Sequence, residues 1–286
     1  MATIQESVKA FLAADRTAMV EVARAKGSTP REAGAYMLVS RSAIHGTIGG
    51  GQLEFMAIDQ ARQIIADPNG LQELMLDIPL GPEIGQCCGG RVEVLIRLVD
   101  DELKTELLRT AEAEQERLPH IYLFGGGHVG QALAVALSLL PVRVTVVETR
   151  AEALDGMPEG VETRLTSVPE EMVRSAPAGA AFVVLTHDHA LDFLIAAEAL
   201  KRTDAPYVGM VGSRTKRAKF VSWYRGEGGT DEALRRLVLP IGDLGLVDKR
   251  PEVIAALAAA EIMVQIGRGQ VLGARPVTTM SGAAID

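Results

Sequence analysis

Cys87 and Cys88, the two cysteines of this chain, stand side by side in the segment GPEIGQCCGGRVEV, residues 81–94, directly before two glycines. A disulfide between neighbours would join α-carbons about 3.8 Å apart, whereas relaxed disulfides need roughly 4.4 Å or more. The histidines are not spaced to complete a four-ligand zinc site with these thiols. Two alternatives remain: a buried pair of small apolar side chains, or an exposed, reactive thiolate on a glycine-rich turn.

A second glycine-rich segment, YLFGGGHVGQALA, has the spacing of a phosphate-binding turn. Gly125, Gly127 and Gly130 fit the pattern G-x-G-x-x-G between a predicted strand and a predicted helix, and Glu148 ends the next strand. In this pattern the first glycine permits the turn, the second lets the backbone approach a pyrophosphate, and the third lets helix and strand pack closely. His128 inside the turn is a candidate donor to the bound group. The segment predicts a Rossmann fold.

The identity of a ligand at this turn stays open. Glu148 stands where an acid binds the ribose diol of a dinucleotide, which favours an unphosphorylated adenosine ribose if a nucleotide binds. Alternatively, the fold persists and its ligand has changed or gone, because a fold does not determine a function.

A cluster of cations opens a later predicted helix in the segment SRTKRAKF. Ser213 is placed to cap this helix, and Arg214, Lys216 and Arg217 fall in its first turn, where they oppose the helix dipole unless an anion compensates them. The cluster follows the strand PYVGMVG, and ligands of open α/β sheets bind at the carboxyl ends of strands. We therefore expect an anion site here, with Arg214 foremost; a solvated charged face is the alternative.

The segment THDHALDFL follows another predicted strand. His187 and His189 could share a side and bind a metal or relay a proton. Alternatively, Asp188 caps the helix that begins near Ala190, and this alternative is favoured because no third metal ligand is visible.

The order of patterns divides the chain into two domains. Segments rich in β-formers surround one helical pattern in residues 1–100, which predicts an α+β domain. Residues 101–119 predict a charged linker helix, and the alternation of strands and helices over 120–275 predicts a Rossmann-like, doubly wound parallel sheet. Residues 276–286 are small and polar, and we expect a loose tail.

Composition narrows the functional class. A net charge of −8 argues against a nucleic-acid partner, because neutralising phosphates requires a basic face. The sequence has neither a signal-peptide pattern nor an apolar run long enough to span a membrane, and two adjacent cysteines give no disulfide framework. We therefore expect a cytoplasmic protein in a reducing compartment.

Taken together, seven segments resemble the XdhC/CoxI family of xanthine dehydrogenase accessory proteins. They are VARAKGSTPREAGAYMLV, GTIGGGQLE, QCCGGRVEV, LFGGGHVGQALA, VVLTHDHALDF, YVGMVGSRTKRAKF and KRPEVIAALAAAEI. The resemblance implies a non-catalytic maturation factor that binds molybdenum cofactor (molybdopterin). It would hold the cofactor while a cysteine desulfurase supplies the terminal sulfido ligand, and then deliver it to the molybdenum subunit of xanthine dehydrogenase. It also implies a homodimer.

The resemblance assigns the family's C-G-G motif to Cys88, Gly89 and Gly90, which makes Cys88 rather than Cys87 the expected molybdenum ligand. A thiolate suits molybdenum, which accepts sulfur ligands, and the adjacent glycines leave room for a pterin. We expect this loop to share a cleft with the Rossmann domain, where Arg214 would meet the terminal phosphate of the pterin.

The glycine run before QLEF is the second family motif. Gly50 and Gly51 permit a close backbone approach, and Glu54 matches the family's acid. Many relatives carry a cysteine where this chain has Gln52, so a molybdenum site built from two cysteine loops is not available here.

Two rival functions remain. An NAD-dependent oxidoreductase would use the glycine turn and Glu148, although no hydride-transfer constellation of acid, base and substrate clamp stands out. A scaffold without a cofactor would bury both cysteines and use the glycines only for structure.

Overall fold

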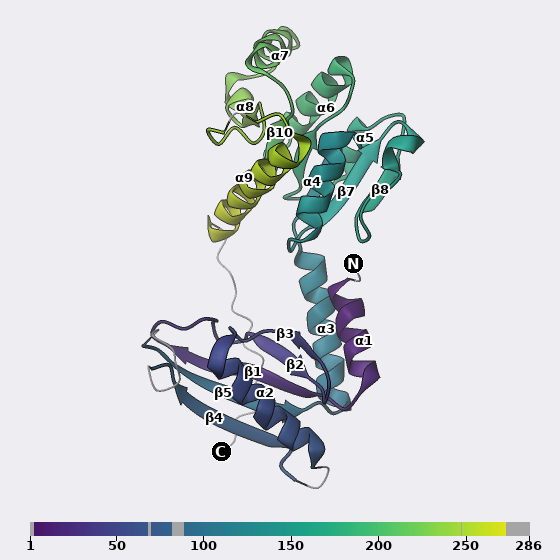
Figure 1. Cartoon of the computed structure of the whole chain (residues 1–286). Coiled ribbons are helices and arrows are strands. Elements are labelled where there is room, and N and C mark those ends of the chain that lie inside the picture. Colours follow the sequence, from purple (N-terminus) through teal and green to yellow (C-terminus); the bar gives the residue numbers. More distant parts are fainter. Residues whose placement is uncertain (1–2, 68–69, 82–88, 247, 273–286) are drawn as a thin grey trace. The chain divides into compact units, whose positions relative to one another are not determined.

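The computed structural model describes residues 3–67, 70–81, 89–246 and 248–272. They form two compact units, residues 3–116 and 117–272 (Figure 1). Cys87, Cys88 and the expected tail 276–286 lie outside the described residues. No helix in the described ranges is both long enough and apolar enough to cross a membrane.

The N-terminal unit is built on a five-stranded antiparallel sheet in the order β3-β2-β1-β5-β4. Its strands are β1 (Ala18–Lys26), β2 (Tyr36–Val39), β3 (Ile44–Gly46), β4 (Glu73–Pro79) and β5 (Arg91–Leu98). The central pair, β1 and β5, runs in register from Ala18 opposite Leu98 to Lys26 opposite Arg91, with a bulge between Val22 and Arg24.

Helix α2 (Gly51–Ala66) covers one face of this sheet. Leu53, Ala57, Ala61 and Ile64 recur at helical spacing and are buried. They pack against alternate strand residues, which point to the same side of a sheet; these are Val20, Val22, Met37, Val39, Val94 and Ile96. The periodicity of α2 therefore determines which face of the sheet it covers.

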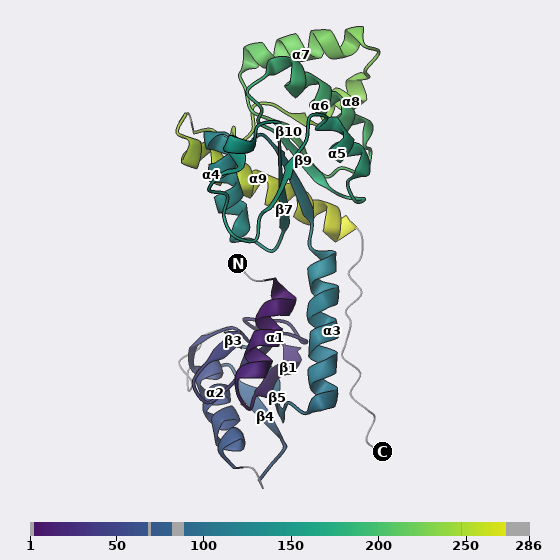
Figure 2. The same cartoon turned by 90° about the vertical axis from the view of Figure 1, so that its right-hand side faces the viewer.

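The opposite face is covered by α1 (Ile4–Ala14) and α3 (Asp101–Arg117), which lie side by side in Figures 1 and 2. Their buried residues Val8, Leu12, Leu103, Leu107 and Ala111 pack with Met19 and Leu38 of the sheet. The segment expected to be a linker helix is therefore a helix whose apolar side belongs to the core of the N-terminal unit.

The C-terminal unit contains a six-stranded parallel sheet in the order β8-β7-β6-β9-β10-β11. Its strands are β6 (His120–Phe124), β7 (Arg143–Glu148), β8 (Glu162–Leu165), β9 (Ala181–Val184), β10 (Val208–Met210) and β11 (Leu237–Val238). This is the strand order of a Rossmann fold. The chain reverses its direction of progress between β6 and β9, so the loops after these two strands leave the sheet toward opposite faces.

Helices cover both faces of the parallel sheet. On one face, α4 (His128–Ser138) and α9 (Pro251–Leu272) pack against Ile121 and Leu123. On the other face lie α5 (Glu170–Ser175), α6 (His189–Lys201), α7 (Arg214–Gly226) and α8 (Asp231–Arg235). Tyr122 and Phe124 point to this second face, as expected for alternate residues of one strand. The 3₁₀ turn η2 (Ala151–Leu154) follows β7.

The predicted fold class is confirmed: an antiparallel α+β unit precedes a Rossmann-like parallel sheet. The sequence patterns indicated one helix before the linker, which is α2, and missed α1, which has 11 residues. Sequence patterns gave no strand for β3, β8 or β11, which have three, four and two residues. All four residues of β8 are exposed, so this edge strand carries no apolar alternation that a pattern could detect.

Substituting Leu107→Ala should destabilise the N-terminal unit, because this side chain on α3 is fully buried. We expect a loss of about 2–5 kcal/mol in the free energy of unfolding, the usual cost of truncating a buried leucine. Guanidinium denaturation followed by far-UV circular dichroism measures it. Leu139→Ala, at a leucine that is 70% exposed, is the matched control and should stay within about 0.5 kcal/mol of the wild type. Equal stabilities of the two variants would contradict the packing described for α3.

Candidate glycine-loop site

In the loop after β6, the three glycines of the G-x-G-x-x-G pattern have different surroundings. Gly125 has φ +124°, and a Cβ there would lie 2.4 Å from the carbonyl oxygen of Leu185. A Cβ on Gly130 would lie 2.0 Å from the carbonyl oxygen of Gly125, so only glycine lets α4 approach β6 so closely. A Cβ on Gly127, in contrast, would meet no atom within 4 Å. The exposed backbone at Gly127 is therefore the place where a ligand can approach.

Gly127 also precedes the first turn of α4, which begins at His128. N–H groups in the first turn of a helix have no acceptor four residues earlier, and the helix dipole adds positive potential. His128 is exposed beside them. The loop therefore offers backbone N–H groups without intrahelical acceptors to an anion, which agrees with the phosphate-binding turn expected from the sequence.

Gly126, between the motif positions, is equally constrained. A Cβ there would lie 2.2 Å from the carbonyl oxygen of Ala153 in η2, and its N–H donates to Glu148 Oε2 at 3.0 Å. The sequence signal for this constraint is the glycine at position 126, because the motif requires glycine only at positions 125 and 127 on either side of it.

Glu148 anchors this loop. Its carboxylate is 4% exposed and accepts from the N–H groups of Gly126 and Thr149, at 3.0 and 2.8 Å, and from Arg150, whose guanidinium lies 3.4 Å away. Burial alone would raise the pKa of Glu148, but these donors outweigh burial and lower the pKa from 4.5 to about 2. Both oxygens are bound within the protein, so this arrangement does not support the expectation that Glu148 binds a ribose.

The glycine turn of the N-terminal unit has the same construction. Gly49, Gly50 and Gly51 all have positive φ, and a Cβ on Gly49 would lie 2.7 Å from Cβ of Pro30. Glu54 turns back on the loop: its Oε2 accepts from the N–H groups of Ile48 and Gly50 at 3.1 and 3.0 Å. Burial opposes ionisation, but these bonds hold the pKa of Glu54 below its usual value. The space around Gly50 is open.

Gly89 and Gly90 directly precede β5, and Gly90 lies close to Gly27 at the end of β1. The Gly89 N–H donates to the Leu80 carbonyl at 2.9 Å, and the Leu80 N–H donates to the Gly90 carbonyl at 2.8 Å. A Cβ on Gly90 would lie 2.3 Å from the carbonyl oxygen of Ser28, whereas the position of Gly89, with φ +69°, is open. Cys88, the expected ligand, precedes Gly89 and lies outside the described residues.

The cations expected to bind an anion have different surroundings. Ser213 caps α7 as expected, since its hydroxyl accepts from the Lys216 N–H at 3.2 Å. Arg217 donates to the carbonyls of β11 and the residue after it at 3.1 and 3.2 Å. The Lys216 ammonium is bound to Asp192 and to the Val211 carbonyl instead of standing free. Within the described ranges, exposed Arg214 has no hydrogen-bond or ion-pair partner.

Asp192 is the functional-looking acid that sequence reasoning missed. It is fully buried, and its Oδ1 accepts from the N–H and hydroxyl of Thr186 at 3.1 and 2.7 Å. Its Oδ2 binds Lys216 and lies 3.7 Å from Nδ1 of His189. The signal was a single acid within the apolar stretch ALDFLIAA of this helix. Asp192 joins the loop after β9 to helix α7.

The HDH segment follows the simpler alternative. Asp188 caps α6, accepting from the Ala190 N–H at 2.8 Å. Among the residues that the structure describes, no three His, Cys, Asp or Glu side chains form a metal cluster. The paired histidines therefore gain no further ligand.

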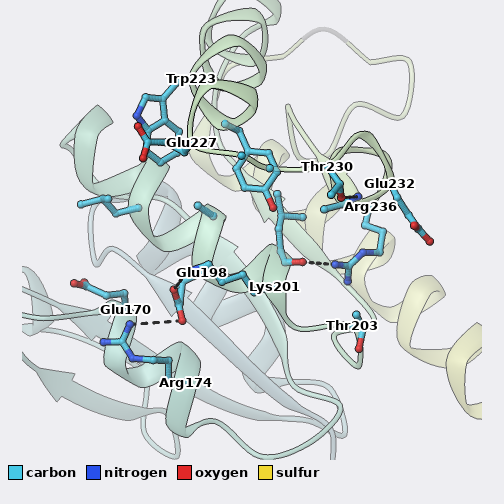
Figure 3. A pocket seen from close by; sticks show the side chains of 17 residues that line it. Glu170, Arg174, Glu198, Lys201, Thr203, Trp223, Glu227, Thr230, Glu232 and Arg236 are labelled. Atoms are coloured by element: carbon cyan, nitrogen blue, oxygen red, sulfur yellow. Dashed lines mark hydrogen bonds and ion pairs between the residues drawn. The ribbon is translucent and has the colours of Figure 1, made fainter.

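A cavity of about 800 Å³ lies among α5, α6, α7 and α8 (Figure 3). Its charged side chains largely satisfy one another: Glu198 binds Arg174 at 3.6 Å and Lys201 at 2.7 Å, and Arg236 donates to backbone carbonyls. None of the residues expected to bind the cofactor lines it.

The antiparallel α+β unit, the Rossmann unit and its anchored glycine loop define a two-unit protein of the Rossmann-containing class. Residues 11–74 match the XdhC and CoxI family, and residues 121–262 match the XdhC Rossmann domain. The chain belongs to the XdhC and CoxI family.

Two individual proteins are similar to this chain. The chain is 28% identical over 257 residues to the Escherichia coli (strain K12) protein named "Uncharacterized protein YqeB", an alignment that covers 86% of this chain and 43% of the relative. The chain thus matches less than half the length of that relative. A solved structure from Bacillus halodurans, of a protein named a xanthine dehydrogenase, aligns with a TM-score of 0.77 at 17% identity. That alignment covers 96% of this chain and 98% of the other, and it shows the shared fold.

The depressed pKa of Glu148 makes the loop's contribution to stability depend on pH. An acid whose pKa is lower when folded stabilises the protein above its unfolded pKa, here near 4.5, and loses that contribution as the pH falls toward 2. Glu148→Gln should therefore cost on the order of 2 kcal/mol at pH 7, with a smaller cost at pH 4 and below. Urea denaturation of both proteins from pH 7 to pH 3.5 measures the difference. A difference that stays constant, or grows on acidification, would contradict the role of the carboxylate.

Proposed function

We propose that this protein is a maturation factor that binds molybdenum cofactor, holds it for sulfuration and inserts it into xanthine dehydrogenase. Membership of the XdhC and CoxI family indicates an accessory role related to xanthine dehydrogenase. The cofactor, its sulfuration and its delivery are the proposal.

The observation that carries the proposal is the open, anchored backbone at Gly127. Glu148 fixes Gly126, so the amides at the start of α4 are positioned before a ligand arrives. An anionic group such as the cofactor's terminal phosphate suits these donors. Glu148 is itself negative, but Arg150 lies 3.4 Å from its carboxylate and offsets that charge. Exposed Arg214 supplies a further free cation in the same unit.

Cys88 is the proposed molybdenum ligand. Molybdenum accepts sulfur ligands, and the positive φ of Gly89 with open space around it fits a turn that carries a bulky group. When bound, the cofactor supplies the molybdenum centre that accepts sulfur and later performs the chemistry of the target enzyme. Gly50, held by Glu54 and followed by Gly51 at the start of α2, offers a second open backbone in the same unit.

The partners in this proposal are a cysteine desulfurase, the molybdenum subunit of xanthine dehydrogenase and a second copy of the chain, in the cytoplasm. The contribution of this chain is to hold the cofactor and exclude solvent from it between the two encounters. Whether Cys88 also carries sulfur as a persulfide belongs to the same proposal.

The structure gives less support to the rival oxidoreductase function than the sequence does. Its main support beyond the glycine turn was Glu148 as a ribose acceptor, and that carboxylate is bound to Gly126, Thr149 and Arg150. The scaffold alternative leaves the open position of Gly127 unexplained, because packing requires glycine at Gly125 and Gly130 but not there.

Cofactor titration of variants tests the proposal. Apo protein is mixed anaerobically with molybdenum cofactor, freed of excess by gel filtration, and assayed for molybdenum and oxidised pterin. Wild type should retain about one cofactor per chain. Cys88→Ala should lose at least about tenfold in affinity, and Arg214→Ala a similar amount if it contributes one charge-assisted contact.

Matched controls are Cys87→Ala, the neighbouring thiol, and Arg235→Ala, an exposed arginine on α8. Both should bind like the wild type. If the wild type retains no cofactor, the proposed function is wrong; if Cys88→Ala and Arg214→Ala both retain it fully, the assignment of these two residues to the site is wrong.

A further inference from the structure

The groove between helices α6 and α7 is a second hollow of about 540 Å³ in the C-terminal unit, here called the α6–α7 groove. It is lined from α6 by His189, Phe193 and Leu194, and from α7 by Lys216, Lys219 and Trp223. Pockets of about 300–1,000 Å³ suit small organic ligands. The groove is separate from the glycine loop, whose residues do not line it.

The floor of the groove is aromatic and rigid. The ring centroids of Phe193 and Trp223 lie 5.4 Å apart, and Phe193 meets buried Phe220 edge to face at 5.1 Å. Leu194 beside them is 51% exposed. The planes of Phe193 and Trp223 are tilted by 38° to one another, so these half-buried rings give the groove an apolar wall against which an aromatic ring can pack.

The polar side of the groove is cationic. An ammonium group has three N–H donors, and those of Lys216 have two acceptors among the described residues, Asp192 and the Val211 carbonyl. One donor is left on a side chain that is only 10% exposed. Lys219, one turn further along α7, is exposed and has no partner in the described part of the chain.

Asp192 neutralises Lys216, so Lys219 sets the charge of the groove. No carboxylate is among the described residues that line it, whereas four glutamates line the larger cavity of Figure 3. Trp223 and Leu194 line both hollows. They lie between the cationic α6–α7 groove and the larger cavity, whose lining carries both acids and bases. A ligand of the α6–α7 groove is therefore anionic or carries an anionic substituent.

We propose that the α6–α7 groove binds a planar aromatic anion, with its ring on Phe193 and Trp223 and its anionic group at Lys219 and the remaining donor of Lys216. Two sources share this chemistry: a free purine nucleotide and a pterin bearing an acidic group. The proposal does not depend on cofactor binding by Cys88, because a nucleotide satisfies it equally.

Trp223 is the sole tryptophan of the chain, so its fluorescence reports on ligands in the α6–α7 groove and in the larger cavity that it also lines, and the Lys219 variant described below separates the two. The intact protein is titrated separately with GMP and with pterin-6-carboxylate, by isothermal titration calorimetry and by the fluorescence lifetime of Trp223. Saturable binding that changes the lifetime is expected for at least one probe. GMP binding alone identifies the nucleotide source, and pterin binding alone identifies the pterin source.

Lys219→Ala should weaken the binding by about tenfold or more, the loss expected for one charge-assisted contact. Lys249→Ala, at another exposed lysine of the same unit, should bind within about twofold of the wild type. Trp223→Phe retains an apolar floor and should weaken binding less than Trp223→Ala. Absence of saturable binding by both probes, or equal affinity of wild type and Lys219→Ala, would overturn the proposal.

Discussion

A buried carboxylate bound to the backbone of a loop is the interaction on which the candidate site depends. Glu148 binds the Gly126 N–H at 3.0 Å and fixes the turn between β6 and α4. The device recurs: Glu54 holds Gly50, Asp192 holds Thr186, and Glu261 accepts from the N–H of Gly242 at 3.0 Å. Charge-assisted bonds of this kind are stronger than neutral ones, so loops that face solvent keep one shape.

The binding of these carboxylates within the protein also determines which charged side chains remain available to a ligand. Two of the acids that hold the loops are paired with cations, Glu148 with Arg150 and Asp192 with Lys216, so these two add little net negative charge to the surface that an anion must approach. Arg214 and Lys219 are outside these pairs. Positive potential at the carboxyl edge of the parallel sheet therefore comes from free cations and helix termini, although the chain as a whole carries a charge of −8.

The fold could be predicted where apolar residues recur at helical spacing, as in the helix from Gly51, or form continuous buried runs, as in the strands around Phe124 and Val183. Sequence patterns also identified Gly125 and Gly130 as required glycines, because the spacing of the motif reflects the close packing of strand, turn and helix. They did not reveal the partners that Glu148 and Lys216 have within the protein. A carboxylate at the end of a strand can face a ribose or its own loop, and only the position of Gly126 decides between them. Lys216 likewise depends on Asp192, 24 residues earlier.

The most direct test of the central claim, that the open backbone at Gly127 receives the anionic group of the cofactor, is cofactor affinity in Gly127→Ala. The backbone there, at φ −70° and ψ −173°, accepts any residue, so the variant should fold while its methyl group occupies the ligand's place. Gly267→Ala on α9, where a Cβ is equally free of contacts, is the control. Affinity that falls at least about tenfold in Gly127→Ala and is unchanged in Gly267→Ala is the predicted result. Unchanged affinity in a folded Gly127→Ala protein would contradict the claim.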